Sequence, residues 1–127
     1  MQKTVIRTES APAPFQGAPY NQAIRVGDLV FVAGQLGLKP GDTGIEGDVA
    51  AQTEQVMRNL AAILEAAGSS LDNLVRTSVC LQDLGDFAAM NEVYARHVGD
   101  RPPARSTVQI SGLPSGALVE IEAVAHT

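Results

Sequence analysis

The chain has 127 residues, of which 45% are hydrophobic and 18% carry a charge. This balance is typical of one packed soluble domain, here residues 1–127, and excludes a disordered polar chain. The formal net charge is −5 and no run of lysine or arginine occurs, so neither a nucleic acid nor an anionic membrane surface is expected as the main partner.

The first third of the chain is predicted to form strands separated by loops. Residues 4–7 form a short first strand, and prolines and glycines between residues 10 and 19 then break regular structure. Tyr20 follows this loop, where an aromatic side chain either packs or belongs to a site, and its position alone does not decide between the two. Residues 21–26 and 29–35 are predicted to be strands joined by a tight turn at Gly27 and Asp28.

The middle of the chain is predicted to hold two helices around a strand. Asp48 is a good N-cap, apolar residues then recur every three or four positions, and Gly68 ends the helix. Residues 74–81 form the next strand, and a second amphipathic helix runs from a cap at Asp86 to Gly99. Neither histidine has a partner at metal-ligand spacing, so no metal is expected.

The chain contains a single cysteine, Cys80, so an intramolecular disulfide is impossible. It lies in the apolar run 79–81 and is predicted to be a small buried hydrophobic residue. No apolar segment resembles a signal peptide or reaches the length of a membrane span, so a cytoplasmic location is expected.

Residues 103–123 contain two alternating apolar runs around a Gly/Pro/Ser break, which predicts a strand, a loop and a returning strand. Arg105 and Thr107 share one face of the first strand, and Glu120 and Glu122 share one face of the second. An antiparallel pair would bring the arginine close to a glutamate, although the long loop leaves the register open. The pattern alone favours a cross-strand ion pair of small net worth. The alternative is a site in which arginine holds a carboxylate and glutamate handles a proton.

A buried strand makes the sheet difficult to cover within one chain. Residues 29–33 are apolar on both pleat faces, which is typical of a strand covered on both sides. Two helices can cover only one face of such a sheet. The second face is therefore expected to be covered by another copy of the chain.

Several segments resemble the RidA/YjgF family of reactive-intermediate deaminases, and the resemblance covers essentially the whole chain. The segments are Pro103-Ala104-Arg105-Ser106, Leu113-Pro114, Val119-Glu120-Ile121, Ala18-Pro19-Tyr20, Ala33-Gly34-Gln35, and Asp86-Phe87 followed by Asn91 and Tyr94. The resemblance implies an α+β, chorismate-mutase-like (YjgF-like) fold, a mixed sheet with two helices on one face, in a trimeric barrel. Active sites would lie in clefts between subunits of this homotrimer.

The same resemblance implies hydrolysis of 2-imino or 2-enamino acids, released by pyridoxal-phosphate dehydratases, to 2-oxo acids and ammonia. Glu120 and Tyr20 would be catalytic, while Arg105, Gly34 and Thr107 would bind the small carboxylate-bearing substrate, without any cofactor. Three positions depart from the family pattern, namely Ala18 for Gly, Ala33 for Ser and Thr107 for Cys. The main alternative is a non-catalytic, small-metabolite-binding or chaperone-like trimer. Ribonuclease activity is disfavoured by the acidic charge, and chorismate-mutase chemistry rests on fold analogy alone.

Overall fold

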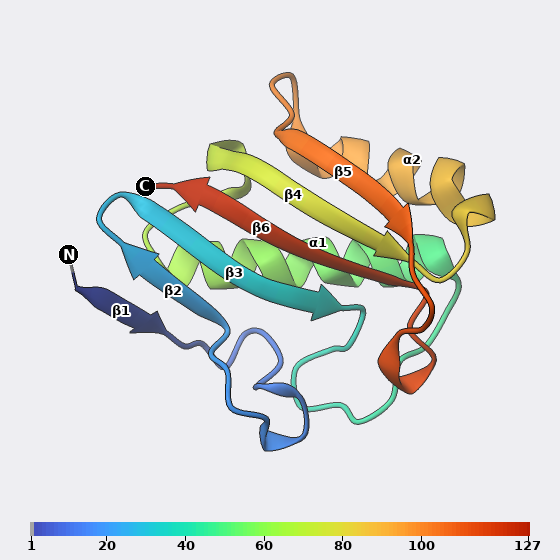
Figure 1. The fold of residues 1–127 in the computed structure, drawn as a ribbon, viewed down its shortest axis with the longest axis horizontal. Helices are drawn as coiled ribbons and strands as arrows, with labels where there is room; N and C mark the ends of the chain where they lie inside the picture. The colour runs from blue at the N-terminus through green and yellow to red at the C-terminus, as the bar shows by residue number, and fades with distance from the viewer. Residues whose placement is uncertain (1) are drawn as a thin grey trace.

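A computed structural model describes residues 2–127 of the protein (Figure 1). Six strands form one sheet in the order β1-β2-β3-β6-β4-β5. In chain order the elements are β1 (Lys3–Ile6), β2 (Ala23–Val26), β3 (Leu29–Leu36), α1 (Val49–Ala66), β4 (Leu74–Leu81), α2 (Phe87–Val98), β5 (Ala104–Gln109) and β6 (Val119–His126). All neighbouring strands are antiparallel except β4 and β5, which are parallel and joined through α2.

Both helices pack on the same face of the sheet, as the sequence predicts, and the core lies between these two layers (Figure 1). Alternate residues of each central strand point into it. Val30 on β3, Val79 on β4 and Ile121 on β6 are at most 1% exposed. They meet the apolar stripe of α1, which includes Met57 and Leu60, both fully buried.

The limits of α1 confirm the predicted signals. The Asp48 carboxylate accepts a hydrogen bond from the Ala51 amide at 2.9 Å. At the other end Gly68 has φ +81°, and the Ser69 amide donates to the Leu64 carbonyl at 2.8 Å, which is a Schellman ending.

The start of α2 differs from the prediction. The helix begins after Asp86, but the Asp86 side chain makes no capping hydrogen bond. The Asp83 carboxylate accepts instead from the Gly85 amide at 2.7 Å, one turn earlier. Gly99, with φ +67°, ends the helix as predicted.

The predicted pairing of the strand carrying Arg105 with the strand carrying Glu120 is wrong. The crossover through α2 lays β5 parallel to β4 at the sheet edge, and the chain then returns to insert β6 between β3 and β4. Arg105 is in register with Thr77, which is fully buried on the helix side. Glu120 lies between the fully buried Val119 and Ile121 and therefore points to the opposite face.

The sheet face turned away from the helices is uncovered and partly apolar. On β3, Val30 and Val32 are buried while Leu29 and Phe31 are 42% and 46% exposed. The expected burial of this strand on both faces is therefore not met within one chain. Cys80 also lies on the open face, opposite Glu120, and is half-buried rather than buried as predicted.

A β-bulge alters the alternation at the start of β4. The register of β4 against β6 shifts between Leu74 and Arg76, so that Leu74 is buried and Val75 is 46% exposed.

Neither helix within residues 2–127 has the length and apolar character needed to cross a bilayer.

Candidate active site

One small cavity, of about 90 Å³, brings together three residues that the sequence singles out, Tyr20, Gly34 and Glu120. Tyr20 comes from the loop before β2, Gly34 from the end of β3 and Glu120 from the start of β6. The other lining residues are Pro12, Ala13, Phe15, Gln22, Gln35, Leu36, Leu38 and Pro114. We call Tyr20, Gly34 and Glu120 the glutamate half-site.

Gly34 makes room for the Glu120 side chain. The register of β3 against β6 shifts between Val32 and Gln35, so Gly34 lies in an irregular part of the ladder. A Cβ atom on Gly34 would lie 2.7 Å from Glu120 Cδ. Glycine is therefore required here by the position of the carboxyl group.

The Glu120 carboxyl is poised to accept a proton. It is half-buried, and none of the hydrogen bonds or ion pairs among residues 2–127 reaches it. Burial raises the pKa of Glu120, and the nearby Glu122 carboxylate raises it further. A carboxylate whose pKa is raised is a stronger base than an ordinary glutamate.

The loop that carries Tyr20 is held by a buried glutamine that sequence reasoning missed. Gln22 is 3% exposed. Its Oε1 accepts from the Thr8 amide at 2.8 Å, and its Nε2 donates to the Pro12 carbonyl at 2.8 Å. The Tyr20 hydroxyl itself accepts a hydrogen bond from the Phe15 amide at 2.5 Å. The only feature of the sequence that could have identified Gln22 as a buried structural residue is its position at the start of a predicted strand, and that signal is weak.

Arg105 lies on the helix side of the sheet against two aromatic rings of α2. Its guanidinium carbon is 4.8 Å from the centroid of the Tyr94 ring and 5.6 Å from that of Phe87. The Tyr94 hydroxyl is hydrogen-bonded to the buried Thr77 hydroxyl at 2.6 Å, which fixes the ring. Such stacking holds the guanidinium plane while leaving its donor edge available.

The ion pair favoured by the sequence pattern is absent. Within the described chain, Arg105 forms no salt bridge with Glu120, Glu122 or any other carboxylate. The cross-strand explanation for this arginine is therefore wrong, because the two side chains lie on opposite faces of the sheet.

Thr107 follows Arg105 on the same side of β5, and its hydroxyl is buried without a hydrogen-bond partner. The amide oxygen of Asn91 on α2 is also buried and unpaired. Asn91 follows Phe87 by four residues, so the two side chains share a helix face. Asn91 is one of the residues on which the sequence resemblance rests, although no role was predicted for it. We call Phe87, Tyr94, Arg105 and Thr107 the arginine half-site.

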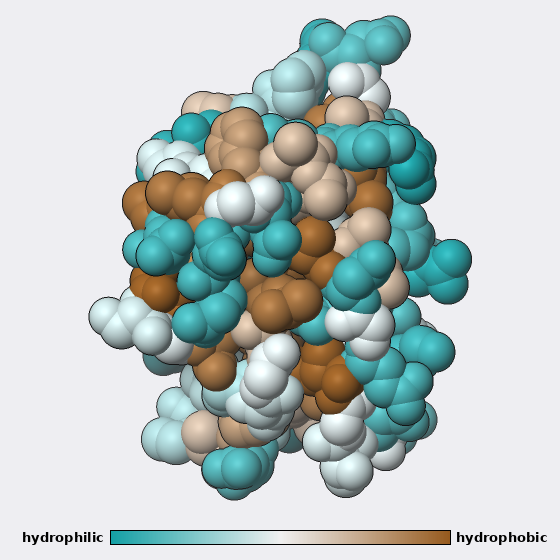
Figure 2. Space-filling view, turned by 90° about the vertical axis from the view of Figure 1, so that its right-hand side faces the viewer, coloured by the Kyte–Doolittle hydropathy of each residue, from teal (hydrophilic) through white to brown (hydrophobic). Residues whose placement is uncertain are grey.

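The end of the molecule where β3, β4 and β5 end shows apolar patches among hydrophilic side chains (Figure 2). Exposed apolar residues of the segments meeting there are Leu84, Phe87 and Val108, each at least 43% exposed. The edge strand β5 also ends there, at Gln109, whereas Arg105 lies near the beginning of that strand (Figure 1).

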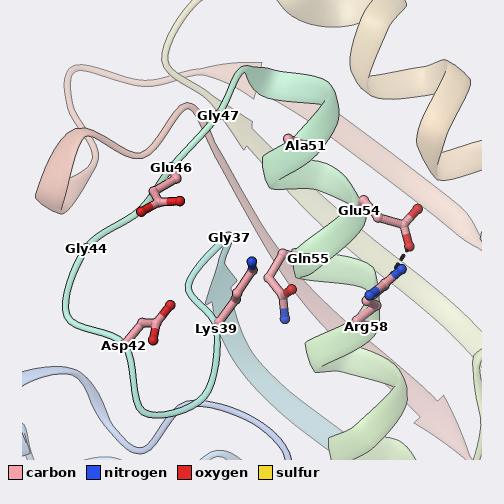
Figure 3. Close-up of a pocket in the computed structure, with 10 residues that line it drawn as sticks. All are labelled: Gly37, Lys39, Asp42, Gly44, Glu46, Gly47, Ala51, Glu54, Gln55 and Arg58. Atoms are coloured by element: carbon pink, nitrogen blue, oxygen red, sulfur yellow. Dashed lines mark hydrogen bonds and ion pairs between the residues drawn. The ribbon is translucent and has the colours of Figure 1, made fainter.

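A larger hollow of about 400 Å³ lies elsewhere, between residues 37–47 and α1 (Figure 3). Lys39, Asp42 and Glu46 extend from the loop, while Glu54 and Arg58 on α1 are paired at 3.0 Å. The hollow contains none of the predicted site residues. Across residues 2–127 no group of three or more His, Cys, Asp or Glu side chains could hold a metal ion.

Comparison with known proteins identifies the family. The family model described as endoribonuclease L-PSP matches residues 8–127. A RutC family protein of Pyrococcus abyssi is 50% identical over 99% of this chain and 98% of its own length. The chloroplastic Reactive Intermediate Deaminase A of Arabidopsis thaliana is 45% identical over 98% of this chain and 66% of its own length.

The fold agrees with a solved member of the same group. The crystal structure of RidA from an Antarctic Psychrobacter species matches with a TM-score of 0.93 and 43% identity, covering 98% of this chain and 99% of that one. The family model, the relatives and the solved structure all lead to one assignment: the chain belongs to the YjgF/RidA family, whose model is described as endoribonuclease L-PSP.

Proposed function

We propose that this protein hydrolyses reactive 2-imino and 2-enamino acids, released by pyridoxal-phosphate dehydratases, to 2-oxo acids and ammonia. The observation that carries the proposal is the cavity in which Tyr20 and Glu120 meet, with a Glu120 carboxyl whose pKa is raised. A relative named Reactive Intermediate Deaminase A supports the same chemistry.

Arg105 binds the substrate in this proposal. A 2-imino acid carries one carboxylate beside its C=N bond, and a planar guanidinium can hold that carboxylate through two parallel hydrogen bonds. Arg105 has no carboxylate partner of its own within residues 2–127, and its stacking on Tyr94 fixes the plane of the fork. The unpaired hydroxyl of Thr107 lies on the same side of β5 and supplies a further polar group near the bound acid.

Glu120 moves protons in this proposal. A water molecule attacks the carbon of the protonated imine, the C–O bond forms, and the π electrons pass to nitrogen while Glu120 accepts a water proton. Glu120 then returns that proton to the amine. The C–N bond then breaks as the oxygen lone pair forms the carbonyl of the 2-oxo acid, Glu120 takes the hydroxyl proton, and it passes this proton to the departing ammonia, which leaves as ammonium. Water is the only other molecule consumed, and the Glu120 carboxylate is regenerated.

The active site is composite in this proposal, because Arg105 and Glu120 lie on opposite faces of the sheet in one chain. The arginine half-site of one copy meets the glutamate half-site of the next. The uncovered apolar sheet face, with Leu29, Phe31 and Val124, packs inward in a homotrimer. Each trimer then holds three equivalent sites.

A catalyst suits the glutamate half-site better than the alternatives do. A pure carboxylate binder has no use for a carboxyl group with a raised pKa in the same cavity as Tyr20. RNA cleavage, which the description of the family model suggests, is poorly supported by a net charge of −5 and the lack of a basic run.

A coupled assay tests the proposal. A serine/threonine dehydratase generates the intermediate, and 2-oxo acid formation is followed with and without this protein. The proposal predicts that the protein raises the rate of oxo-acid release well above spontaneous hydrolysis, and that Glu120→Gln abolishes the increase. A rate that is unchanged by the parent protein would favour a binding protein instead.

A further inference from the structure

Two strained turns border the glutamate half-site. Within residues 2–127 the non-glycine residues with positive φ are Gln16, at +53°, and Ser115, at +57°. Their neighbours Phe15 and Pro114 both line the cavity that contains Glu120. The left-handed conformation is unfavourable for most L residues, and residues held in it concentrate at functional sites.

The side chain of Gln16 does not explain its conformation. It is exposed and takes part in none of the hydrogen bonds among the described residues. The backbone of the turn is held instead, because the Gly17 amide donates to the Pro14 carbonyl at 3.2 Å and the Ala18 amide donates to the Phe15 carbonyl at 3.1 Å. Gln16 therefore contributes through its backbone conformation, which sets the path of the chain before and after it.

That direction determines how Tyr20 is held. The turn points the Phe15 amide at the Tyr20 hydroxyl, 2.5 Å away. A phenol oxygen that accepts an N–H bond keeps its own hydrogen available to donate. No acceptor for that hydrogen occurs among the hydrogen bonds of residues 2–127, and the Tyr20 ring lines the cavity beside Glu120.

We propose that Gln16 is a positioning residue whose left-handed conformation makes Tyr20 a hydrogen-bond donor to the oxygen atom at the reacting carbon. This inference rests on the proposed function. In the Glu120 cavity the water oxygen loses a proton as it bonds to carbon, so a donor there stabilises the intermediate and the product carbonyl. Tyr20 then donates a hydrogen bond, while Glu120 alone carries the proton.

A double-mutant cycle tests the coupling between Gln16 and Tyr20. Valine is β-branched and disfavours the left-handed region, whereas asparagine tolerates it. Tyr20→Phe is expected to lower kcat/KM about tenfold, the scale of one lost hydrogen bond. Gln16→Val is expected to lower it severalfold in the parent, but less than about twofold in the Tyr20→Phe background. Gln16→Asn is expected to behave as the parent does.

Ser115→Val is the matched control, because it places the same residue in the same conformation on the opposite turn. Its effect on kcat/KM should be equal in the parent and in the Tyr20→Phe background. Equal effects of Gln16→Val in both backgrounds would overturn the proposal, since Gln16 would then not act through the Tyr20 hydroxyl.

Amide hydrogen exchange at Phe15 tests the geometry without turnover. The Phe15 amide should be protected from exchange in the parent and in Gln16→Asn. Its protection factor should fall at least about tenfold in Tyr20→Phe and in Gln16→Val. Unchanged protection in Tyr20→Phe would overturn the proposal even in an active enzyme. A parent that fails the coupled assay but shows the expected exchange pattern would refute the deaminase function and leave the turn geometry correct.

Discussion

Replacing Arg105 by lysine separates two contributions of the guanidinium group. Its carbon lies 4.8 Å from the Tyr94 centroid and 5.6 Å from the Phe87 centroid. Cation–π contacts at partly exposed sites contribute about 0.5–1 kcal/mol each, and an ammonium group retains part of this. The expected loss of unfolding free energy in Arg105→Lys is therefore below about 1 kcal/mol.

The expected effect on binding is larger. The planar guanidinium group donates two parallel hydrogen bonds, whereas the lysine ammonium group is a point charge. One charge-assisted hydrogen bond, of about 1.5–3 kcal/mol, is therefore lost. The Kd for a stable 2-oxo acid should rise by about tenfold to a hundredfold. Titration calorimetry measures the Kd, and thermal or denaturant unfolding of the same samples measures the stability.

Arg25→Lys is the control, because it removes a guanidinium group that lies outside the proposed binding site. Arg25 donates to the Ala67 carbonyl at 3.2 Å and to the Gly27 carbonyl at 3.1 Å, and it lines neither half-site. This variant should lose stability and keep the parent Kd. If Arg105→Lys binds the 2-oxo acid as tightly as the parent does, the bidentate clamp is wrong.

Three further predictions concern ionisable groups. Glu120→Gln should lower turnover about a hundredfold or more, yet be more stable than the parent at pH 7. Burial and Glu122 raise the pKa of Glu120, so the ionised carboxylate destabilises the folded protein. This destabilisation is absent below the ordinary pKa of glutamate and grows as the pH rises through the raised pKa. An equal stability difference at pH 4 and pH 7 would refute this cause, and Glu122→Gln should keep its turnover. Burial, then Glu120 and Glu122, raise the pKa of the Cys80 thiol, so native alkylation should be slow and Cys80→Ala should stay active; fast alkylation with inactivation would reveal a thiol function. The hydrogen bond from His97 lowers the pKa of Glu54, so Glu54→Gln should lose about 0.3–0.5 kcal/mol of unfolding free energy at pH 7. This loss should shrink as the pH falls through the lowered pKa, and denaturant titrations giving equal losses at pH 7 and pH 3 would contradict it.

Local signals in the sequence predicted most elements of the fold. Asp48 and Gly68 mark the two ends of α1, because a capping carboxylate and a left-handed glycine act within a few residues of themselves. The apolar run of residues 29–33 likewise identified β3. It predicted cover on both faces of the strand, and within one chain only the helix side is covered.

The arrangement of the strands could not be predicted in the same way. The position of β6 between β3 and β4 depends on contacts between residues far apart in the chain, and residues 110–118 are too long a loop to fix a register. For that reason the sequence placed Arg105 beside Glu120, whereas the structure places them on opposite faces. The irregular pairing at Gly34, which makes room for Glu120, also leaves no periodic signal.

Mixing two inactive variants tests most directly whether Arg105 and Glu120 act across a subunit boundary. Arg105→Ala and Glu120→Gln are each expected to be inactive in the coupled assay. The two variants are coexpressed in equal amounts, and in the proposed trimer each composite site draws its arginine and its glutamate from different chains. Half of the arginines and half of the glutamates are intact, so about a quarter of the parent activity should return. Full inactivity of the mixture, with subunit exchange verified by differently tagged chains, would contradict the composite site.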